Sequence, residues 1–533
     1  MKSISLLDCT LRDGGYVNDW DFGHSVITGT YKRLDAAGVD YIEVGFLDDR
    51  REFNINKTIQ PNTSCYNEIF RGIEKKNAIP VAMIDYGTCS IENIADCSDT
   101  FIDGIRVIFK KEKINEALPF CMAIKEKGYK LFIQAISITA YSDMEMLQYV
   151  EKINQIHPFA FSIVDTYGLL NERNLERYFN LINNNLVSDI AIGYHAHNNF
   201  QLAFSNTLHF LSFYANRPVI ADATVYGMGK SAGNCPIELL SMYMNNFYEK
   251  NYDVFQFLEV FDTDLAAIYQ KQYWGYKYNF FISAMQNCHP SYVQYLLDKK
   301  TLSVSSVNEI LSSIPDEQKL LYDLKLIENL YVEYQSRTID DKFDVERLRA
   351  EMSDRNVVIL GPGSSIRTQK SNILNFIRSH DSAVISVNVE LSDYECGYIF
   401  VSNAKRYSKL SDMSEKKSSA KLIVTSNISL FDRKADYILN YSSLLSFNNT
   451  NSDNALLLLI AALIKAGVKE VQLAGFDGFS SVGNDYYDSR YSFAGNSDYN
   501  LKSNETTIKG LKELTSFIKI NFLTDSLYER GLN

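Results

Sequence analysis

Two histidines that lie two residues apart, His195 and His197, follow a run of strand-forming residues and could bind a metal ion. Residues i and i+2 of a β-strand point to the same face, so both imidazoles would project together. Asp13, which follows the first apolar run of the chain, could add a carboxylate oxygen. Two imidazoles and one carboxylate suit a divalent cation and leave positions open for a substrate. We expect Mn²⁺ or Mg²⁺ first, with Zn²⁺ as an alternative; a purely structural histidine pair is the competing interpretation.

Two further segments could contribute to the same chemistry. The first, Asp8-Cys9-Thr10-Leu11-Arg12-Asp13-Gly14-Gly15, places an arginine beside the candidate ligand. Arg12 offers fixed donors to an oxyanion or a carboxylate, although a salt-bridged turn is the alternative. The second runs from Tyr226 to Asn234 and contains three glycines, which allow a backbone to approach a ligand closely. Asn234 could add a carbonyl oxygen to the metal, and a tight turn is the alternative for this loop.

Each of these segments follows a predicted strand. The first 230 or so residues alternate short apolar runs with helical periodicity, such as 25–37 and 175–184. The predicted strands are Ile4–Leu7, Tyr41–Val44, Val81–Ile84, Gly104–Ile108, Leu131–Ile136, Phe161–Val164, Ile190–Tyr194 and Val219–Thr224. This pattern predicts an α/β fold, a (β/α)8 TIM barrel, in which the carboxyl ends of all strands meet at one mouth. A doubly wound sheet is the alternative.

The rest of the chain changes character twice. Residues 235–350 are predicted as a helical extension and linker, with helices at 237–248, 255–269 and 320–334. Residues 351–533 return to an α/β pattern and predict a separate Rossmann-like domain. An apolar helix is predicted at 455–465, and the predicted strands are Val357–Leu360, Val384–Val387, Tyr398–Val401, Leu422–Thr425 and Val471–Ala474. The three predicted domains are therefore 1–234, 235–350 and 351–533.

The Rossmann-like part opens with a candidate phosphate or nucleotide loop. A buried strand, Val357–Leu360, leads into Gly361-Pro362-Gly363-Ser364-Ser365, where backbone N–H groups and hydroxyls meet a helix start. Gly361, Gly363, Ser364 and Ser365 could hold a phosphate there. The loop lacks the full GxGxxG and the Walker lysine, so a tight turn without ligand is the alternative. Asp477 follows a late strand and could face the same crevice.

Composition limits the class of protein. Of the 533 residues, 65 are Asp or Glu and 53 are Lys or Arg, for a formal net charge of −12. That balance gives no general attraction to nucleic acid or an anionic membrane. The eight cysteines include no CxxC pair, so neither a zinc ribbon nor a dithiol redox motif is indicated. The longest apolar run, 455–464, is far shorter than the ~20 residues that span a bilayer. The first residues do not resemble a signal peptide, and a cytoplasmic location is expected.

The three segments, in this order, resemble the DRE-TIM metallolyase superfamily. Its members include 4-hydroxy-2-oxovalerate aldolase, 3-hydroxy-3-methylglutaryl-CoA lyase, isopropylmalate and homocitrate synthases, and the carboxyltransferase domain of pyruvate carboxylase. The family pattern is Arg-Asp-Gly after the first strand, His-x-His after the seventh and a glycine-rich loop ending in Gly-Asn after the eighth. This sequence matches it with Arg12-Asp13-Gly14, His195-Ala196-His197 and the loop 227–234. The resemblance covers about residues 1–290.

The resemblance implies a role for each matching residue. Asp13, His195 and His197 would hold the cation, with Asn234 nearby. The cation would chelate the carboxylate and carbonyl of a 2-oxo acid and stabilise the enolate that forms when a C–C bond is made or broken. Arg12 would donate hydrogen bonds to the same developing oxyanion.

Further candidates lie near the ends of other predicted strands. Glu43 matches a polar position of the family, and Asp165 and Thr166 are candidate contacts for the substrate. For Glu43 and Asp165, an internal hydrogen bond at the barrel mouth is an equally good interpretation.

Departures from the family patterns favour one branch. The strand-eight loop contains no cysteine, since Cys235 falls after it, which argues against the hydroxymethylglutaryl-CoA lyases. The sixth strand ends at Asp165 without the lysine of the carboxyltransferases. The nearest branch is the 4-hydroxy-2-oxovalerate aldolase type, in which a histidine three residues after the metal aspartate acts as general acid and base. Here that position is Tyr16, which could donate a proton. His24 could substitute for that histidine, or could simply begin a helix.

These observations predict a metal-dependent aldolase or lyase acting next to a 2-oxo acid. The first alternative is a Claisen-type synthase that joins an acyl-CoA to a 2-oxo acid on the same barrel. The second is a lapsed barrel whose C-terminal domain is a nucleotide-sugar-binding or transferase module for surface polysaccharide synthesis. The expected partners are a small 2-oxo acid and an aldehyde or acyl donor, without nucleic acid or membrane. A homo-oligomer and an aldehyde dehydrogenase partner are further hypotheses.

Overall fold

The computed structural model describes residues 3–299, 302–336, 338–413, 419–430, 434–446, 453–480, 486–488 and 497–532. The chain divides into two compact units. The first comprises Met1–Ser291 and Lys319–Leu321, and the second Tyr292–Gln318 and Tyr322–Asn533. The three predicted domain ranges stay predictions.

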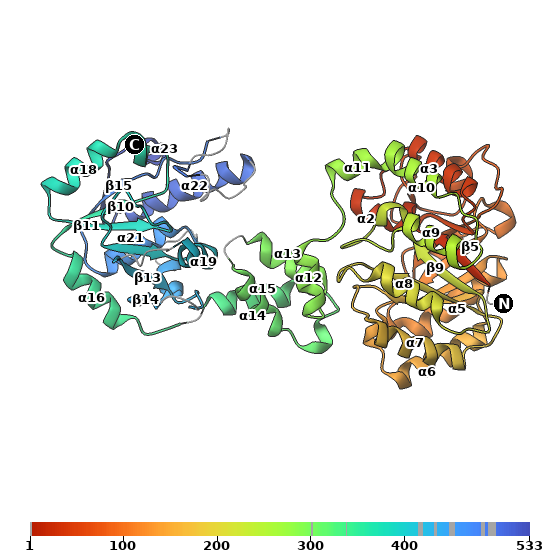
Figure 1. Cartoon of the computed structure of the whole chain (residues 1–533). Coiled ribbons are helices and arrows are strands. Elements are labelled where there is room, and N and C mark those ends of the chain that lie inside the picture. The colour runs from red at the N-terminus through yellow and green to blue at the C-terminus, as the bar shows by residue number, and fades with distance from the viewer. Residues whose placement is uncertain are drawn as a thin grey trace. The chain divides into compact units, whose positions relative to one another are not determined.

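The first unit contains a closed parallel barrel (Figure 1). Its strands are β1 (Ile4–Asp8), β2 (Tyr41–Leu47), β4 (Ile79–Asp85), β5 (Gly104–Ile108), β6 (Lys130–Ala135), β7 (Ala160–Asp165), β8 (Ala191–Ala196) and β9 (Val219–Ala223). Each pairs in parallel with its neighbours, and β1 closes the barrel by pairing with both β9 and β2. The predicted (β/α)8 barrel is therefore confirmed. A short extra strand, β3 (Ile59–Gln60), extends the sheet beyond β2 and was not predicted.

Helices surround the barrel strands because each has one apolar face. The principal helices are α3 (His24–Ala36), α4 (Cys65–Ile69), α5 (Ile114–Glu126), α6 (Asp143–Ile156), α7 (Glu172–Asn185), α8 (Ala203–Ser212), α9 (Ile237–Phe247) and α10 (Val254–Val260). In α7, Leu175, Phe179 and Ile182 recur at helical spacing and are buried, while Glu172 and Arg173 stay in solvent. The unit continues through a π-helical turn (Phe261–Leu265), α11 (Ala266–Lys271) and α12 (Tyr278–Met285).

The second unit begins with helices and ends with a parallel sheet. Its first helices are α13 (Pro290–Asp298), α14 (Val304–Ser312), α15 (Leu324–Gln335) and α16 (Lys342–Met352). The seven sheet strands, in spatial order, are β14 (Tyr437–Leu439), β13 (Lys421–Thr425), β12 (Tyr398–Val401), β11 (Ser382–Val387), β10 (Asn356–Leu360), β15 (Glu470–Ala474) and β16 (Lys519–Phe522). This is the predicted Rossmann-like architecture, to which β14 and β16 are additions.

Helices cover both faces of this sheet because successive residues of a strand point to opposite faces. Val357 and Ile359 of β10 pack in the cluster that includes α16, α21 (Ala455–Lys465) and α22 (Ser497–Leu514). Val358 and Leu360 pack in a cluster with α17 (Ser365–Thr368) and α18 (Lys370–Ser379). The remaining helices are α19 (Ala404–Met413), α20 (Tyr441–Leu445) and α23 (Leu527–Leu532). In the parts of the chain described, no helix combines the length and the apolar character needed to cross a membrane.

Candidate functional site

The predicted ligands Asp13, His195 and His197 meet at the carboxyl end of the barrel. His195 lies within β8, His197 directly follows it, and Asp13 ends α1 (Thr10–Asp13), a single turn after β1. Oδ2 of Asp13 lies 3.8 Å from Nε2 of His195 and 3.9 Å from Nε2 of His197. All three residues are buried, and one ligand atom from each lies within 4.8 Å of the others. The predicted metal site thus has converging donors.

Asn234, the fourth predicted ligand, completes this cluster. Its Nδ2 donates a hydrogen bond to Oδ2 of Asp13, and its backbone forms an isolated bridge with that of His197. Its Oδ1 is buried and has no hydrogen-bond partner in the described part of the chain. A buried carbonyl oxygen without a partner is unfavourable unless something else satisfies it. The four residues therefore fit a divalent cation, because one carboxylate, two imidazoles and an unsatisfied amide oxygen converge.

Gly229 shows why the strand-eight loop needs a glycine. A Cβ at this position would lie 2.7 Å from Oδ2 of Asp13 and would also collide with the amide of Asn234. The φ angle of Gly229 is not in the left-handed region, so the requirement is one of space. The loop backbone approaches the ligands more closely than any side chain would permit.

A buried ion network lies beneath the cluster and comprises Arg12, Asp13, Glu43, Arg106 and Asp222. Arg12 donates to Asp13 from Nη1 at 2.7 Å and to Glu43 from Nε at 2.6 Å. Nη1 of Arg106 lies 3.1 Å from Glu43, and its Nη2 pairs with Asp222. Buried charges are tolerated only when they are paired in this way.

The network connects to the cluster through His195, whose Nδ1 lies 3.0 Å from Oδ2 of Asp222. The sequence-based predictions include no role for Arg106 or Asp222. A signal was present, since each is a charged residue inside an otherwise apolar strand, 104–108 and 219–224 respectively. Such an interruption requires a buried partner, but the sequence does not show where that partner lies.

The surroundings of Asp13 and His197 favour the protonation states that bind a cation. Burial would raise the pKa of Asp13, but Arg12 and then His197 and His195 outweigh it and hold that pKa well below its usual range. Burial lowers the pKa of His197 to about 3, against a smaller opposing effect of Asp13. At neutral pH Asp13 is ionised and His197 is neutral, which are the forms that bind metals.

A second set of residues that could bind a metal ion also lies close together: Cys9, His195 and Asp222. Burial raises the pKa of the Cys9 thiol well above its usual value, so the thiolate that binds metals is disfavoured. Nη1 of Arg106 lies 3.3 Å from the sulfur and would repel a cation there. The Asp13 cluster is therefore the better candidate.

Tyr16 lies at the rim of the site. Its ring makes an edge-to-face contact with Trp20 at 4.8 Å between centroids, and the ammonium of Lys230 lies 5.4 Å from the ring centroid. The residue is 42% exposed, yet desolvation of its hydroxyl end raises its pKa to about 12, with Arg12 opposing the shift. Tyr16 therefore keeps its proton at neutral pH.

The other predicted site residues have partners inside the protein. His24 is the first residue of α3, and its Nε2 lies 2.9 Å from the carbonyl oxygen of Ile69. Its ring therefore bonds to the backbone, and no contact in the described structure joins it to the Asp13 cluster. Asp165 accepts the N–H groups of residues 169 and 170, and Thr166 accepts the N–H of Ser137. Burial raises the pKa of Asp165 to about 6, against these backbone hydrogen bonds. For Glu43 and Asp165 the structure shows the internal contacts that were the alternative to substrate binding.

A cavity of about 530 Å³ opens beside the cluster. It is lined by Tyr16 and Gly229, by aromatic residues including Trp274, and by three lysines: Lys230, Lys271 and Lys277. Desolvation lowers the pKa of Lys230, with Asp13 opposing the shift. The cavity therefore offers cationic and aromatic contacts to whatever extends from the metal cluster.

The donors of the candidate phosphate loop in the second unit already form hydrogen bonds within the protein. The N–H of Ser365 donates to Oδ2 of Asp477 at 2.8 Å, and Oγ of Ser364 donates to the same oxygen at 3.0 Å. The N–H groups of Gly361 and Gly363 donate to the carbonyls of residues 474 and 475. Asp477 faces this loop as predicted, and its carboxylate occupies the position that a bound phosphate would take. These donors are consequently not free for a phosphate.

The fold and the cluster define a (β/α)8 barrel with a buried aspartate–histidine cluster that could hold a metal ion. The model of the HMGL-like family matches residues 3–263, which contain all eight strands of the barrel. A relative named oxaloacetate decarboxylase, from Mycobacterium tuberculosis, is 27% identical over 239 residues, 44% of this chain and 68% of the relative. A 4-hydroxy-2-oxovalerate aldolase from Bacillus cereus is 22% identical over 272 residues, 50% and 77% of the two chains. Among solved structures, the N-terminal domain of a candidate aldolase from Bacteroides vulgatus is 23% identical with a TM-score of 0.48, covering 57% of this chain and 99% of that one.

Proposed function

We propose that the barrel is a divalent-metal-dependent lyase of the aldolase type, which makes or cleaves a C–C bond next to the carbonyl of a 2-oxo acid. The observation that carries this proposal is the convergence of Asp13, His195, His197 and the unsatisfied Oδ1 of Asn234 beside the guanidinium of Arg12. The oxaloacetate decarboxylase and the 4-hydroxy-2-oxovalerate aldolase have names that refer to 2-oxo acids, which supports the same class of substrate.

The four converging residues would hold the cation. When bound, it would supply Lewis acidity to the carbonyl and carboxylate of the 2-oxo acid. Arg12 would act on the same oxygen. Its Nε and Nη1 are held by Glu43 and Asp13, whereas no described residue accepts a hydrogen bond from Nη2. A fixed donor of this kind stabilises the negative charge that develops on an enolate oxygen.

Tyr16 would transfer the proton that completes the reaction. A phenol with a pKa of about 12 is a proton donor, not a base, at neutral pH. Tyr16 lines the same cavity as Gly229, whose missing Cβ leaves the space beside Asp13. The other half of the substrate would extend into this cavity, where the three lysines favour a part that carries negative charge.

The test combines metal analysis with product formation. Full-length wild type and the double variant H195A/H197A are loaded with Mn²⁺, dialysed and assayed for bound metal and for pyruvate release from a set of 4-hydroxy-2-oxo acids. H157A is the matched control, because His157 lies on the surface beside Asp189. We expect about one ion per chain and pyruvate release in wild type and H157A, and the loss of both in the double variant.

Two other results would contradict the proposal. Absence of bound metal in wild type after loading with Mn²⁺, Mg²⁺ or Zn²⁺ would exclude the metal site. Bound metal with release of thiol from an acyl-CoA and a 2-oxo acid, without pyruvate release, would favour a Claisen-type synthase instead.

A further inference from the structure

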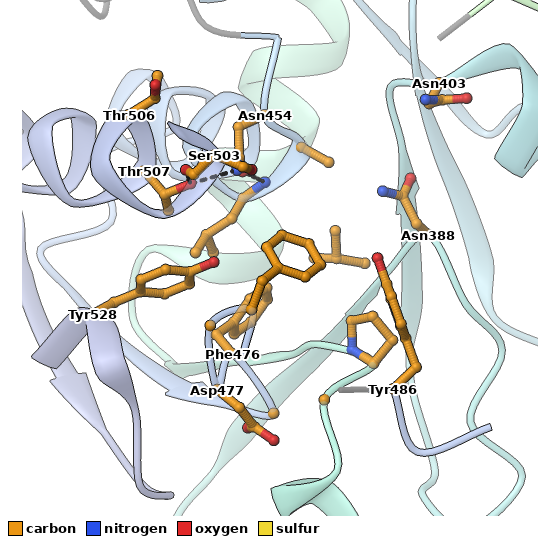
Figure 2. Close-up of a pocket in the computed structure, with 18 of the residues that line it drawn as sticks. Asn388, Asn403, Asn454, Phe476, Asp477, Tyr486, Ser503, Thr506, Thr507 and Tyr528 are labelled. Atoms are coloured by element: carbon orange, nitrogen blue, oxygen red, sulfur yellow. Dashed lines mark hydrogen bonds between the residues drawn. The ribbon is translucent and has the colours of Figure 1, made fainter. Parts of the chain in front are cut away.

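The second unit has a cavity at the point where the order of its parallel strands reverses. β10 lies between β11 on one side and β15 on the other, so the order of the strands reverses at β10. In open parallel sheets, the crevice at the carboxyl ends of such strands is where ligands bind. A cavity of about 380 Å³ lies there, lined by the segments that follow β10, β11, β12 and β15 and by α21 and α22 (Figure 2). That volume is at the small end of ligand pockets.

Two unsatisfied polar groups line this cavity. Ser402, directly after β12, is 4% exposed, and its Oγ has no hydrogen-bond partner among the residues that the structure describes. Oδ1 of Asn388, directly after β11, is likewise buried without a partner. The backbone of Asn388 has a φ of 62°, a conformation that ordinary side chains rarely adopt. Unpaired buried groups of this kind indicate a missing partner, and here both belong to the lining of one cavity.

Aromatic rings and cations complete the lining. Phe476, Tyr486 and Tyr528 lie around the cavity, and their rings can pack against a planar group (Figure 2). Arg406 is buried in the lining, 5% exposed, and its guanidinium carbon lies 5.6 Å from the ring centroid of Tyr486. Lys502 adds a second cation from α22. The lining also contains the carboxylates of Asp453 and Asp477, so an anionic group of a ligand is favoured only next to Arg406 and Lys502.

The anion cannot lie where a dinucleotide-binding fold usually holds it. The N–H of Ser365, at the helix start after β10, already binds the carboxylate of Asp477. A phosphate there would face the negative charge of Asp477 and would find no free donor. Arg406 and Lys502 belong to α19 and α22, which pack on opposite faces of the sheet, so the anionic group is expected between these two helices.

We propose that this cavity binds a nucleoside monophosphate, or the nucleotide part of a larger compound. The base packs against the aromatic rings, and its hydrogen-bonding edge meets the amide of Asn388 and the hydroxyl of Ser402. An amide suits such an edge because it offers a donor and an acceptor side by side. The phosphate pairs with Arg406 and Lys502. The volume suits one nucleotide unit and not two.

The test is calorimetric titration of the full-length protein with AMP, GMP, CMP and UMP, the corresponding nucleosides, and inorganic phosphate. We expect at least one monophosphate to bind with one site per chain, and its nucleoside to bind at least about tenfold more weakly, because the charged contacts are lost. Inorganic phosphate alone should not bind measurably. Absence of binding by all four monophosphates at about 1 mM would overturn the proposal.

Three variants locate the site. N388G removes the amide but keeps the left-handed backbone that glycine adopts readily, and R406Q removes the cation; each should weaken binding about tenfold or more. R355Q is the matched control, because Arg355 is bound to Asp381 at the opposite, amino-terminal end of β10. Wild-type affinity in both N388G and R406Q would also overturn the proposal. D13N should bind the nucleotide as wild type does, so a failed barrel proposal and a failed nucleotide proposal can be distinguished.

Discussion

Oδ2 of Asp222 lies 3.0 Å from Nδ1 of His195, while Nε2 of the same ring faces Asp13. The carboxylate fixes the ring so that its other nitrogen can bind a cation, which is the arrangement that strengthens histidine ligands. Asp222 also pairs with Arg106, so the orientation of His195 is tied to the buried ion network.

D222N is therefore expected to weaken Mn²⁺ binding about 10- to 100-fold. Calorimetric titration of metal-free protein measures this change. D189N is the matched control, because Asp189 pairs with His157 on the surface at the similar distance of 3.1 Å. Equal Mn²⁺ affinities for D222N and wild type would show that the Asp222–His195 contact has no part in metal binding.

G229A should abolish metal binding while the protein stays folded. The new Cβ would lie 2.7 Å from Oδ2 of Asp13, so the ligand must move. Metal content after Mn²⁺ loading, with a circular dichroism spectrum as the check on folding, measures the outcome. G29A is the control, because its Cβ would meet only the ends of two side chains, Arg33 at 3.2 Å and Asp264 at 3.4 Å, and the exchange favours helix α3. A normal metal content in G229A would contradict the close approach of the loop to Asp13.

Y16F should reduce kcat about 100-fold and leave the metal content unchanged, because it removes a proton donor and no ligand. Y214F, at a tyrosine that is 80% exposed, is the control. Because the raised pKa of about 12 keeps Tyr16 protonated, wild-type activity should not fall between about pH 7 and 9 through loss of this proton. Full activity of Y16F would assign proton transfer to another group.

The stability of the second unit should depend on Glu351 in acid. Burial opposes ionisation, but hydrogen bonds from Lys421, Tyr398 and Tyr437 lower the pKa of Glu351 to about 2, from an ordinary value of 4.5. A lowered pKa in the folded state adds stability above about pH 4.5, and this contribution disappears as the pH falls from there towards about 2. E351Q should therefore be less stable than wild type by about 1–3 kcal/mol at about pH 7 and by much less at about pH 2.5.

Urea unfolding can isolate this effect. The two tryptophans, Trp20 and Trp274, both belong to the first unit, so loss of circular dichroism without a change in tryptophan fluorescence reports the second unit. E346Q is the control, since the side chain of Glu346 is 62% exposed. The same destabilisation of E351Q in neutral and in acidic solution would be inconsistent with the lowered pKa.

Local signals account for the parts of the fold that the sequence predicts well. The eight barrel strands are apolar runs bounded by polar residues, and the helix 455–465 is apolar on every side, as its burial requires. The convergence of His195 and His197 follows from the two-residue repeat of a strand. β14 was missed because it has only three residues, and β16 because its side chains are only partly buried and its apolar signal is weak.

Contacts between distant segments account for what the sequence does not predict. Arg106 and Asp222 are 116 positions apart and meet only because β5 and β9 belong to one closed barrel. Similarly, Asp477 lies 112 positions from Ser365, so its occupation of the candidate phosphate loop depends on the pairing of β10 with β15. The residue types indicate that these side chains need partners, but the topology determines which residues these partners are.

The buried ion network has a consequence for the order of events in a catalytic cycle. Its two guanidinium groups and three carboxylates leave one negative charge in a site shielded from water. If the barrel acts on a 2-oxo acid as proposed, an acid that arrived first would meet that charge, whereas a divalent cation that arrived first would reverse its sign and attract the acid. The proposed function therefore predicts ordered binding, with the cation before the acid, and removal of the metal should abolish the affinity for pyruvate as well as turnover.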